Sequence, residues 1–206
     1  MIQYRPDTHR KLGFRKVRKE EEDNDQSQLN LFVQVQDPEK TIQILRHLDP
    51  FEKGLKLDEK NPGLAKKLYL EAIASGISVA DAHCNLGILH AREGATAKAI
   101  TSFTKALVTD PSHLEGHYNL ANMYYDAGNY YLAATHYEVA LELEGAFAEI
   151  AFNLALAYIS MDQRKPAIKT LKVFLEKTSG DEAKEAQLLL QLLEVDQQNP
   201  ARPGSR

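Results

Sequence analysis

The chain has 206 residues, and 43% of them are hydrophobic, which is enough to bury a core in one domain or in an elongated array. Its net charge of −4 argues against a protein that coats nucleic acid, and its single cysteine excludes an internal disulfide. No uncharged apolar run approaches the roughly 18 residues of a membrane-spanning helix, and the polar N-terminus lacks the apolar segment of a secretory signal. We therefore expect a soluble, cytoplasmic protein with no membrane partner.

Residues 1–36 come first, and their composition predicts a disordered, charged tail. They lack periodicity, and a basic arm is followed by an acidic run at residues 20–25. The basic residues are Arg5, Arg10, Lys11, Arg15, Lys16, Arg18 and Lys19. Such an arm could touch nucleic acid weakly or act as a localisation signal, but so few charges establish neither, and nucleic acid is not an expected partner.

A short motif in this tail, Gln28-Leu29-Asn30-Leu31-Phe32, resembles the Gln-Leu-Ser/Asp-Leu-Phe peptide by which bacterial replication proteins dock on the sliding clamp. Only Asn30 departs from that pattern. The resemblance implies a replication-associated clamp binder, and a disordered tail suits such a linear motif. The docking residues would be Gln28, Leu29, Leu31 and Phe32. In the alternative reading, the apolar residues of the motif pack on the first helical unit.

Residues 37–79 are expected to hold a short amphipathic helix, within residues 39–48, and then a degenerate pair of helices. The first helix of this pair is predicted over residues 51–57. The second carries small residues at Ala65 and Ala72, and the same spacing of small residues returns in the units that follow.

Three blocks then follow at a period of 34 residues, and asparagine, a poor helix former, recurs at the same place in each. The blocks span residues 80–113, 114–147 and 148–180. The repeated asparagines are Asn85, Asn119 and Asn153, and each is followed by a leucine and then by a small residue. Alanine recurs later in the blocks at positions 99, 133 and 167 and again at 106 and 140, where the third block instead has Phe174.

This pattern resembles the tetratricopeptide repeat, which has small residues at positions 8, 20 and 27 of each unit and large residues at positions 7, 11 and 24. In that family the small residues let the two antiparallel helices of a unit pack closely, and stacked units form a right-handed superhelix. The resemblance therefore implies an all-α, tetratricopeptide-type α-solenoid.

A leucine-rich helix is expected over residues 181–196, with a second disordered tail over residues 197–206. A repeat array needs a terminal helix with a polar outer face to cover its last exposed core, and this helix would do so. Its leucines are spread more widely than one face requires, which leaves self-association as an alternative role.

The resemblance also implies a concave groove, lined by the first helix of each unit. Its candidate residues are Asp81, Cys84, Asn85, Ile88, Arg92, Glu115, Tyr118, Asn119, Asn122, Tyr125, Asp126, Glu149, Phe152, Asn153 and Leu156. The repeated asparagines are expected on the inner wall rather than in the core, where an amide can pair with the backbone of an extended peptide. The alternatives are that they serve only the local helix–helix contact and that the aromatic residues pack between repeats.

The charges at these positions favour a neutral or basic partner. The family includes chaperone adaptors that hold a terminal carboxylate with Lys and Arg at positions 2, 5 and 6, whereas position 2 here is Asp81, Glu115 and Glu149. We predict a non-catalytic adaptor or scaffold that binds a protein or peptide segment in the concave groove. The alternatives are clamp binding through the tail and a self-assembling structural scaffold.

No chemistry-bearing motif appears beside the repeats. The sequence lacks a phosphate loop, a nucleophile elbow and a zinc-protease helix, so we predict no enzymatic activity and no cofactor. His113 and His117 are four residues apart, but a turn between two units separates them, so no metal site is predicted.

Overall fold

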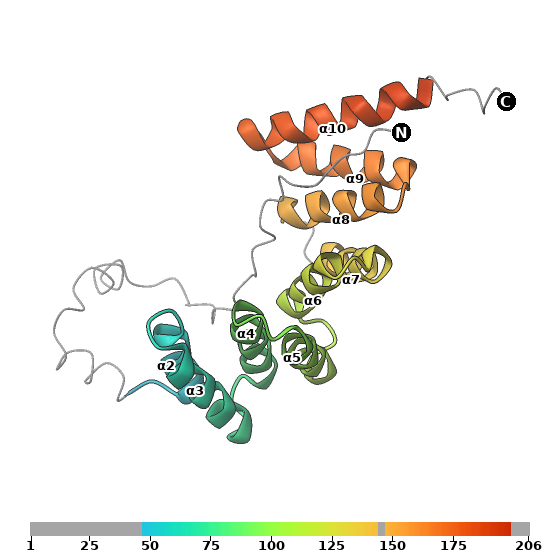
Figure 1. Cartoon of the computed structure of the whole chain (residues 1–206). Coiled ribbons are helices and arrows are strands. Elements are labelled where there is room, and N and C mark those ends of the chain that lie inside the picture. Colours follow the sequence, from blue (N-terminus) through green and yellow to red (C-terminus); the bar gives the residue numbers. More distant parts are fainter. Residues whose placement is uncertain (1–46, 144–146, 199–206) are drawn as a thin grey trace. The chain divides into compact units, whose positions relative to one another are not determined.

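The computed structural model describes residues 47–143 and 147–198, and the regular elements in these ranges are all α-helices (Figure 1). The predicted all-α class is therefore confirmed. The helices belong to two compact units, one ending at His113 and the other beginning at Leu114. No helix in the described ranges is long and apolar enough to cross a membrane.

Helical hairpins build the first unit. Its described helices are α2 (Pro50–Leu57), α3 (Pro62–Ala74), α4 (Val79–Arg92) and α5 (Thr96–Thr109). Helix α2 packs on α3 and α4 packs on α5, while α3 also contacts α4. Asp49 caps α2 because its carboxylate accepts the Glu52 N–H at 2.8 Å. Asn61 caps α3 by accepting the Leu64 N–H at 3.0 Å.

Two glycines let the helices of these hairpins approach closely. A Cβ at Gly54 would lie 2.6 Å from the ring of Tyr69, and a Cβ at Gly87 would lie 2.5 Å from the ring of Phe103. Both distances are shorter than non-bonded carbon atoms tolerate, so a side chain at either glycine would overlap the buried ring. The surrounding core of the first unit contains Phe51, Ala65, Tyr69, Ala72, Ala82, Leu86 and Leu89.

The second unit continues the pattern of hairpins and ends in a long helix. Its described helices are α6 (Leu114–Asp126), α7 (Tyr130–Leu143), α8 (Ala148–Ser160), α9 (Arg164–Lys177) and α10 (Asp181–Gln198). Each helix packs on the next one in the chain. Its core includes Tyr118, Ala121, Tyr137, Ile150, Leu154, Leu171, Phe174 and Leu189.

Helix α10 covers α9 with one face. Ala183, Ala186 and Leu189 are buried, and Lys172 of α9 bonds to Glu194 at 3.0 Å. The helix ends at Gln198, slightly beyond the predicted end at residue 196. On the opposite side, Leu188, Leu192 and Val195 are exposed.

The turns of three hairpins use left-handed backbone. The φ angle is +73° at Gly94 and +75° at Gly128, between α4 and α5 and between α6 and α7. Asp162 takes this place between α8 and α9 with φ of 56°. Aspartate is one of the few residues with a side chain that adopts this conformation at modest cost, so the third turn forms without glycine.

Candidate functional site

The predicted groove residues lie on α4, α6 and α8, the first helices of their hairpins, but most of their side chains are buried. The buried ones are Cys84, Asn85, Ile88, Tyr118, Asn119, Asn122, Tyr125, Phe152, Asn153 and Leu156. The exposed fractions of Asn85, Asn119 and Asn153 are 2%, 0% and 5%. The asparagines are thus buried, whereas they were expected outside the core, and their contact with a ligand stays a prediction.

In the second unit, several of these buried polar side chains form hydrogen bonds with side chains of neighbouring helices. The Asn153 amide donates to the Tyr118 hydroxyl at 3.1 Å and so joins α8 to α6. The Tyr137 hydroxyl of α7 donates to the side-chain oxygen Oδ1 of Asn122 in α6. Burial, and then the nearby Tyr118, raises the pKa of Tyr137 well above its usual value, so this hydroxyl remains a donor. These contacts support the packing alternative for Tyr118 and Asn153.

Aromatic rings link the same helices. Phe152 of α8 and Phe174 of α9 have ring centroids 5.1 Å apart, and the centroids of Tyr118 and Tyr137 are 6.0 Å apart. Tilted pairs at these separations stabilise a core beyond the area that they bury. Phe174, at a position where the family prefers a small residue, is thus accommodated as part of an aromatic pair.

The accessible members of the predicted groove are charged. Arg92, Asp126 and Glu149 are exposed, while Asp81 and Glu115 are half-buried. Asp81 lies 3.0 Å from Nε2 of the buried His113, within the first unit. In the second unit the accessible groove residues Glu115, Asp126 and Glu149 are all acidic.

A histidine pair on α6 and α7 was not predicted from the sequence. Nδ1 of His117 and Nδ1 of His136 are 3.0 Å apart, and Tyr124 stacks on the His136 ring at 5.7 Å. Burial, and then the charge of His117, lowers the pKa of His136 to about 4, so this ring is neutral at neutral pH. The described residues contain no group of three or more metal-ligating side chains.

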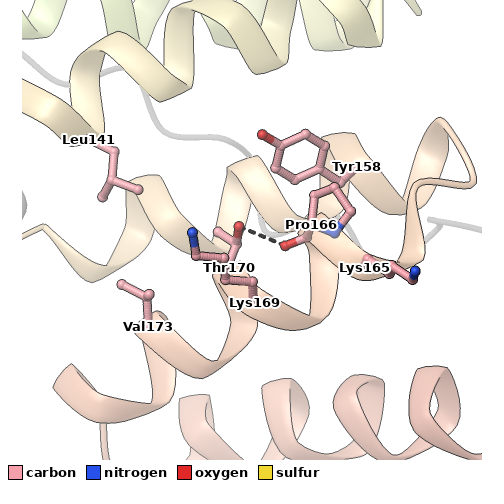
Figure 2. Close-up of a pocket in the computed structure, with 7 residues that line it drawn as sticks. All are labelled: Leu141, Tyr158, Lys165, Pro166, Lys169, Thr170 and Val173. Carbon is pink, nitrogen blue, oxygen red and sulfur yellow. Dashed lines mark hydrogen bonds between the residues drawn. The ribbon is translucent and has the colours of Figure 1, made fainter.

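A pocket lies beside α9, on residues that the groove prediction does not include (Figure 2). Its volume is about 490 Å³. It is lined by Leu141, Tyr158, Lys165, Pro166, Lys169, Thr170 and Val173. Comparing the blocks column by column could have found it, because lysines replace Ala97 and Thr101 of the first block.

The other predicted sites have different outcomes. The motif at residues 28–32 lies outside the described residues, so clamp docking stays a prediction. Cys84 is fully buried in α4, which leaves no accessible thiol there.

Sequence profiles of the tetratricopeptide repeat match residues 80–113 and 149–177. No curated protein matches the sequence significantly. The structure of MamA from Desulfovibrio magneticus RS-1 is similar, with a TM-score of 0.61 and 20% identity over 74% of this chain and 88% of that one.

Two peptide complexes are also similar in structure. The first tetratricopeptide domain of Spaghetti (RPAP3), bound to the HSP90 peptide SRMEEVD, has a TM-score of 0.52 and 19% identity over 58% of this chain and 93% of that one. The TPR2B domain of yeast Sti1, in a pHsp70 complex, has a TM-score of 0.51 and 19% identity over 57% of this chain and 97% of that one. At these identities the likeness is one of fold. The two profile matches thus identify tetratricopeptide repeats at residues 80–113 and 149–177 of this chain, and the solved structures share its fold.

Proposed function

We propose that this chain is a non-catalytic protein-interaction module, an adaptor or scaffold, that binds a neutral or basic segment of a partner protein along α6 and α8. The observation that carries the proposal is the acidic character of every accessible groove residue in the second unit. These residues are Glu115, Asp126 and Glu149. Carboxylates at the rim of an interface select the charge of the partner and speed its association.

The geometry of α6 supports one continuous surface. Glu115 and Asp126 lie about three helical turns apart, so they project on the same side of the helix. Tyr118 and Asn122 lie between them on this side, and the bond from Asn153 to Tyr118 fixes α8 against α6. The buried amides and rings therefore make a rigid wall, and the carboxylates make its accessible edge. We propose that Asn122 and Asn153 position these helices and do not pair directly with a ligand.

Two of the similar structures support a peptide as the kind of partner. The RPAP3 domain is bound to the HSP90 peptide SRMEEVD, which is itself acidic, and the Sti1 domain is in a pHsp70 complex. This chain has Glu115 and Glu149 at position 2, where the carboxylate-holding members of the family have basic residues. We infer that it selects peptides of the opposite charge class.

A random peptide library displayed on phage tests this function on the full chain. We expect the selected peptides to be neutral or basic, and we expect Glu115→Lys/Glu149→Lys to weaken the binding of a selected peptide roughly tenfold or more. The control is Glu71→Lys/Glu142→Lys, which makes the same charge change at exposed residues of α3 and α7. Selection of acidic peptides whose binding is indifferent to Glu115 and Glu149 would overturn the proposal.

Self-association is a second candidate role, which the exposed face of α10 favours. Leu188 and Val195 are 58% and 61% exposed, on a helix whose other face is already packed. The molar mass of the full chain in solution, measured by light scattering across a concentration series, tests this role. A mass that stays at 23.1 kDa at all concentrations would exclude it.

A further inference from the structure

We propose that the pocket beside α9 is a second docking site, and that it binds an acidic segment of a partner protein with an apolar side chain among its carboxylates. The site goes beyond the proposed function, because it uses another set of residues and selects the opposite charge. The pocket is formed by α7, α8 and α9 within the second unit (Figure 2). Its volume of about 490 Å³ falls in the range of small binding sites.

Two cations at the pocket are available to a ligand. Lys165 and Lys169 are exposed and stand one helical turn apart on α9. Neither ammonium group forms an ion pair in the part of the chain that the structure describes. Other lysines do, since Lys66 bonds to Glu93 at 2.6 Å and Lys172 bonds to Glu194 at 3.0 Å. The ammonium groups of Lys165 and Lys169 are therefore not engaged by an acidic side chain among the described residues.

The fold of the hairpin does not require these cations. The equivalent residues are Ala97 and Thr101 on α5, and Tyr131 and Thr135 on α7. In those helices the threonine hydroxyl donates to the backbone carbonyl one turn earlier, at 2.8 Å for Thr101 and 3.0 Å for Thr135. The two lysines are thus particular to the third hairpin, and the packing of the repeat does not explain them.

The rest of the pocket offers apolar surface. Leu141, Pro166 and Val173 present hydrocarbon, and the Tyr158 ring faces the same space (Figure 2). The Tyr158 hydroxyl donates to the Glu138 carboxylate, and the Thr170 hydroxyl donates to the Pro166 carbonyl at 2.9 Å. Because both hydroxyls already have acceptors, the lysines are the polar groups left for recognition.

The charge of α9 decides which ligand fits. Its sequence, RKPAIKTLKVFLEK, has five basic residues and one acidic residue, in a chain whose net charge is −4. A carboxylate-bearing segment is attracted to this helix, and an aliphatic or aromatic side chain within it can cover the apolar lining. Phosphate recognition would favour the two-pronged geometry of arginine, which the pocket lining lacks. An acidic peptide is therefore the partner that the lining fits.

The test uses the full chain labelled with ¹⁵N and the peptide acetyl-Glu-Asp-Leu-Phe-Asp-Glu-amide as the probe. We expect chemical-shift changes at the amides of residues 165 and 167–173 and at those of Leu141 and Tyr158. Lys165→Glu/Lys169→Glu should weaken binding roughly tenfold or more, because it reverses both charges that face the ligand. The control Lys60→Glu/Lys67→Glu makes the same charge change at exposed residues of the first unit and should leave the affinity within about twofold.

Further binding measurements distinguish this site and this ligand from other sites and other ligands. A peptide with serines in place of Leu and Phe should bind at least severalfold more weakly, and equal binding would overturn the apolar part of the proposal. Stronger shifts of the same amides by a single-stranded oligonucleotide, or shifts confined to other helices, would overturn the assignment of the ligand. The Glu115→Lys/Glu149→Lys variant should retain binding of the acidic probe. Failure of one site is therefore distinguishable from failure of the other.

Discussion

The His136 side chain makes the stability of the second unit depend on pH. Its folded pKa of about 4 lies below the unfolded value near 6.5, so the unfolded chain binds more protons between these values. The contribution of His136 to stability is therefore present above pH 6.5 and is lost as the pH falls towards 4. We expect the urea concentration at the midpoint of unfolding to decrease when the pH is lowered from 7.5 to 5.0. The decrease should be smaller in the His136→Gln variant. An unchanged pH dependence in the variant would contradict the assignment.

At the residue scale, sequence reasoning located the repeated asparagines but misjudged their surroundings. The 34-residue period placed Asn85, Asn119 and Asn153 on equivalent positions of first helices, where the structure has them. Whether an amide at this position reaches solvent depends on how tightly adjacent helices pack. The repeat period of the sequence gives no information about the distance between those helices. The bond between Asn153 and Tyr118 joins residues 35 apart, one more than the period, so no single unit reveals it.

At the element scale, α10 presents two faces with different expected effects on stability. Leu189 is 6% exposed and lies in the core of the second unit, whereas Leu192 is 40% exposed. We expect Leu189→Ala to lower the free energy of unfolding by about 2–4 kcal/mol, because it leaves a cavity against α9. Leu192→Ala removes the same atoms from a partly solvated site. It should lower the free energy of unfolding by less than about 1 kcal/mol.

Urea unfolding measures both α10 variants, and hydrogen exchange in α9 shows whether the loss is local to the end of the array. Equal effects of the two substitutions would mean that α10 does not cap the unit through the described face.

Helices were more predictable than the contacts between them. Small residues in the 34-residue pattern, such as Ala133 and Ala167, predict close helix pairs directly, and the structure buries both fully. The pocket beside α9 combines residues of α7, α8 and α9, and its lysines carry no signal within a single helix. The His117–His136 pair likewise joins residues of two helices, which a helical pattern in either one cannot indicate.

At the scale of the whole molecule, the N-terminal tail and the folded units are expected to act separately. Among the described residues, the buried apolar side chains run from Phe51 to Ala106 in the first unit and from Tyr118 to Leu189 in the second. The clamp-like motif at residues 28–32 precedes both, and a linear motif gains its affinity from a few side chains of an extended segment.

Deleting residues 1–36 should therefore abolish capture by an immobilised bacterial sliding clamp, if the motif docks there, while binding of a selected peptide to α6 and α8 persists. Leu31→Ala/Phe32→Ala in the full chain is the matched variant, because it removes two docking side chains and keeps every charge of the tail. Clamp capture that survives this variant but not the deletion would assign the interaction to the basic arm, whose binding must then weaken steeply with salt. Loss of peptide binding on deletion would show that the tail belongs to the interaction face, and would overturn the separation of the two functions.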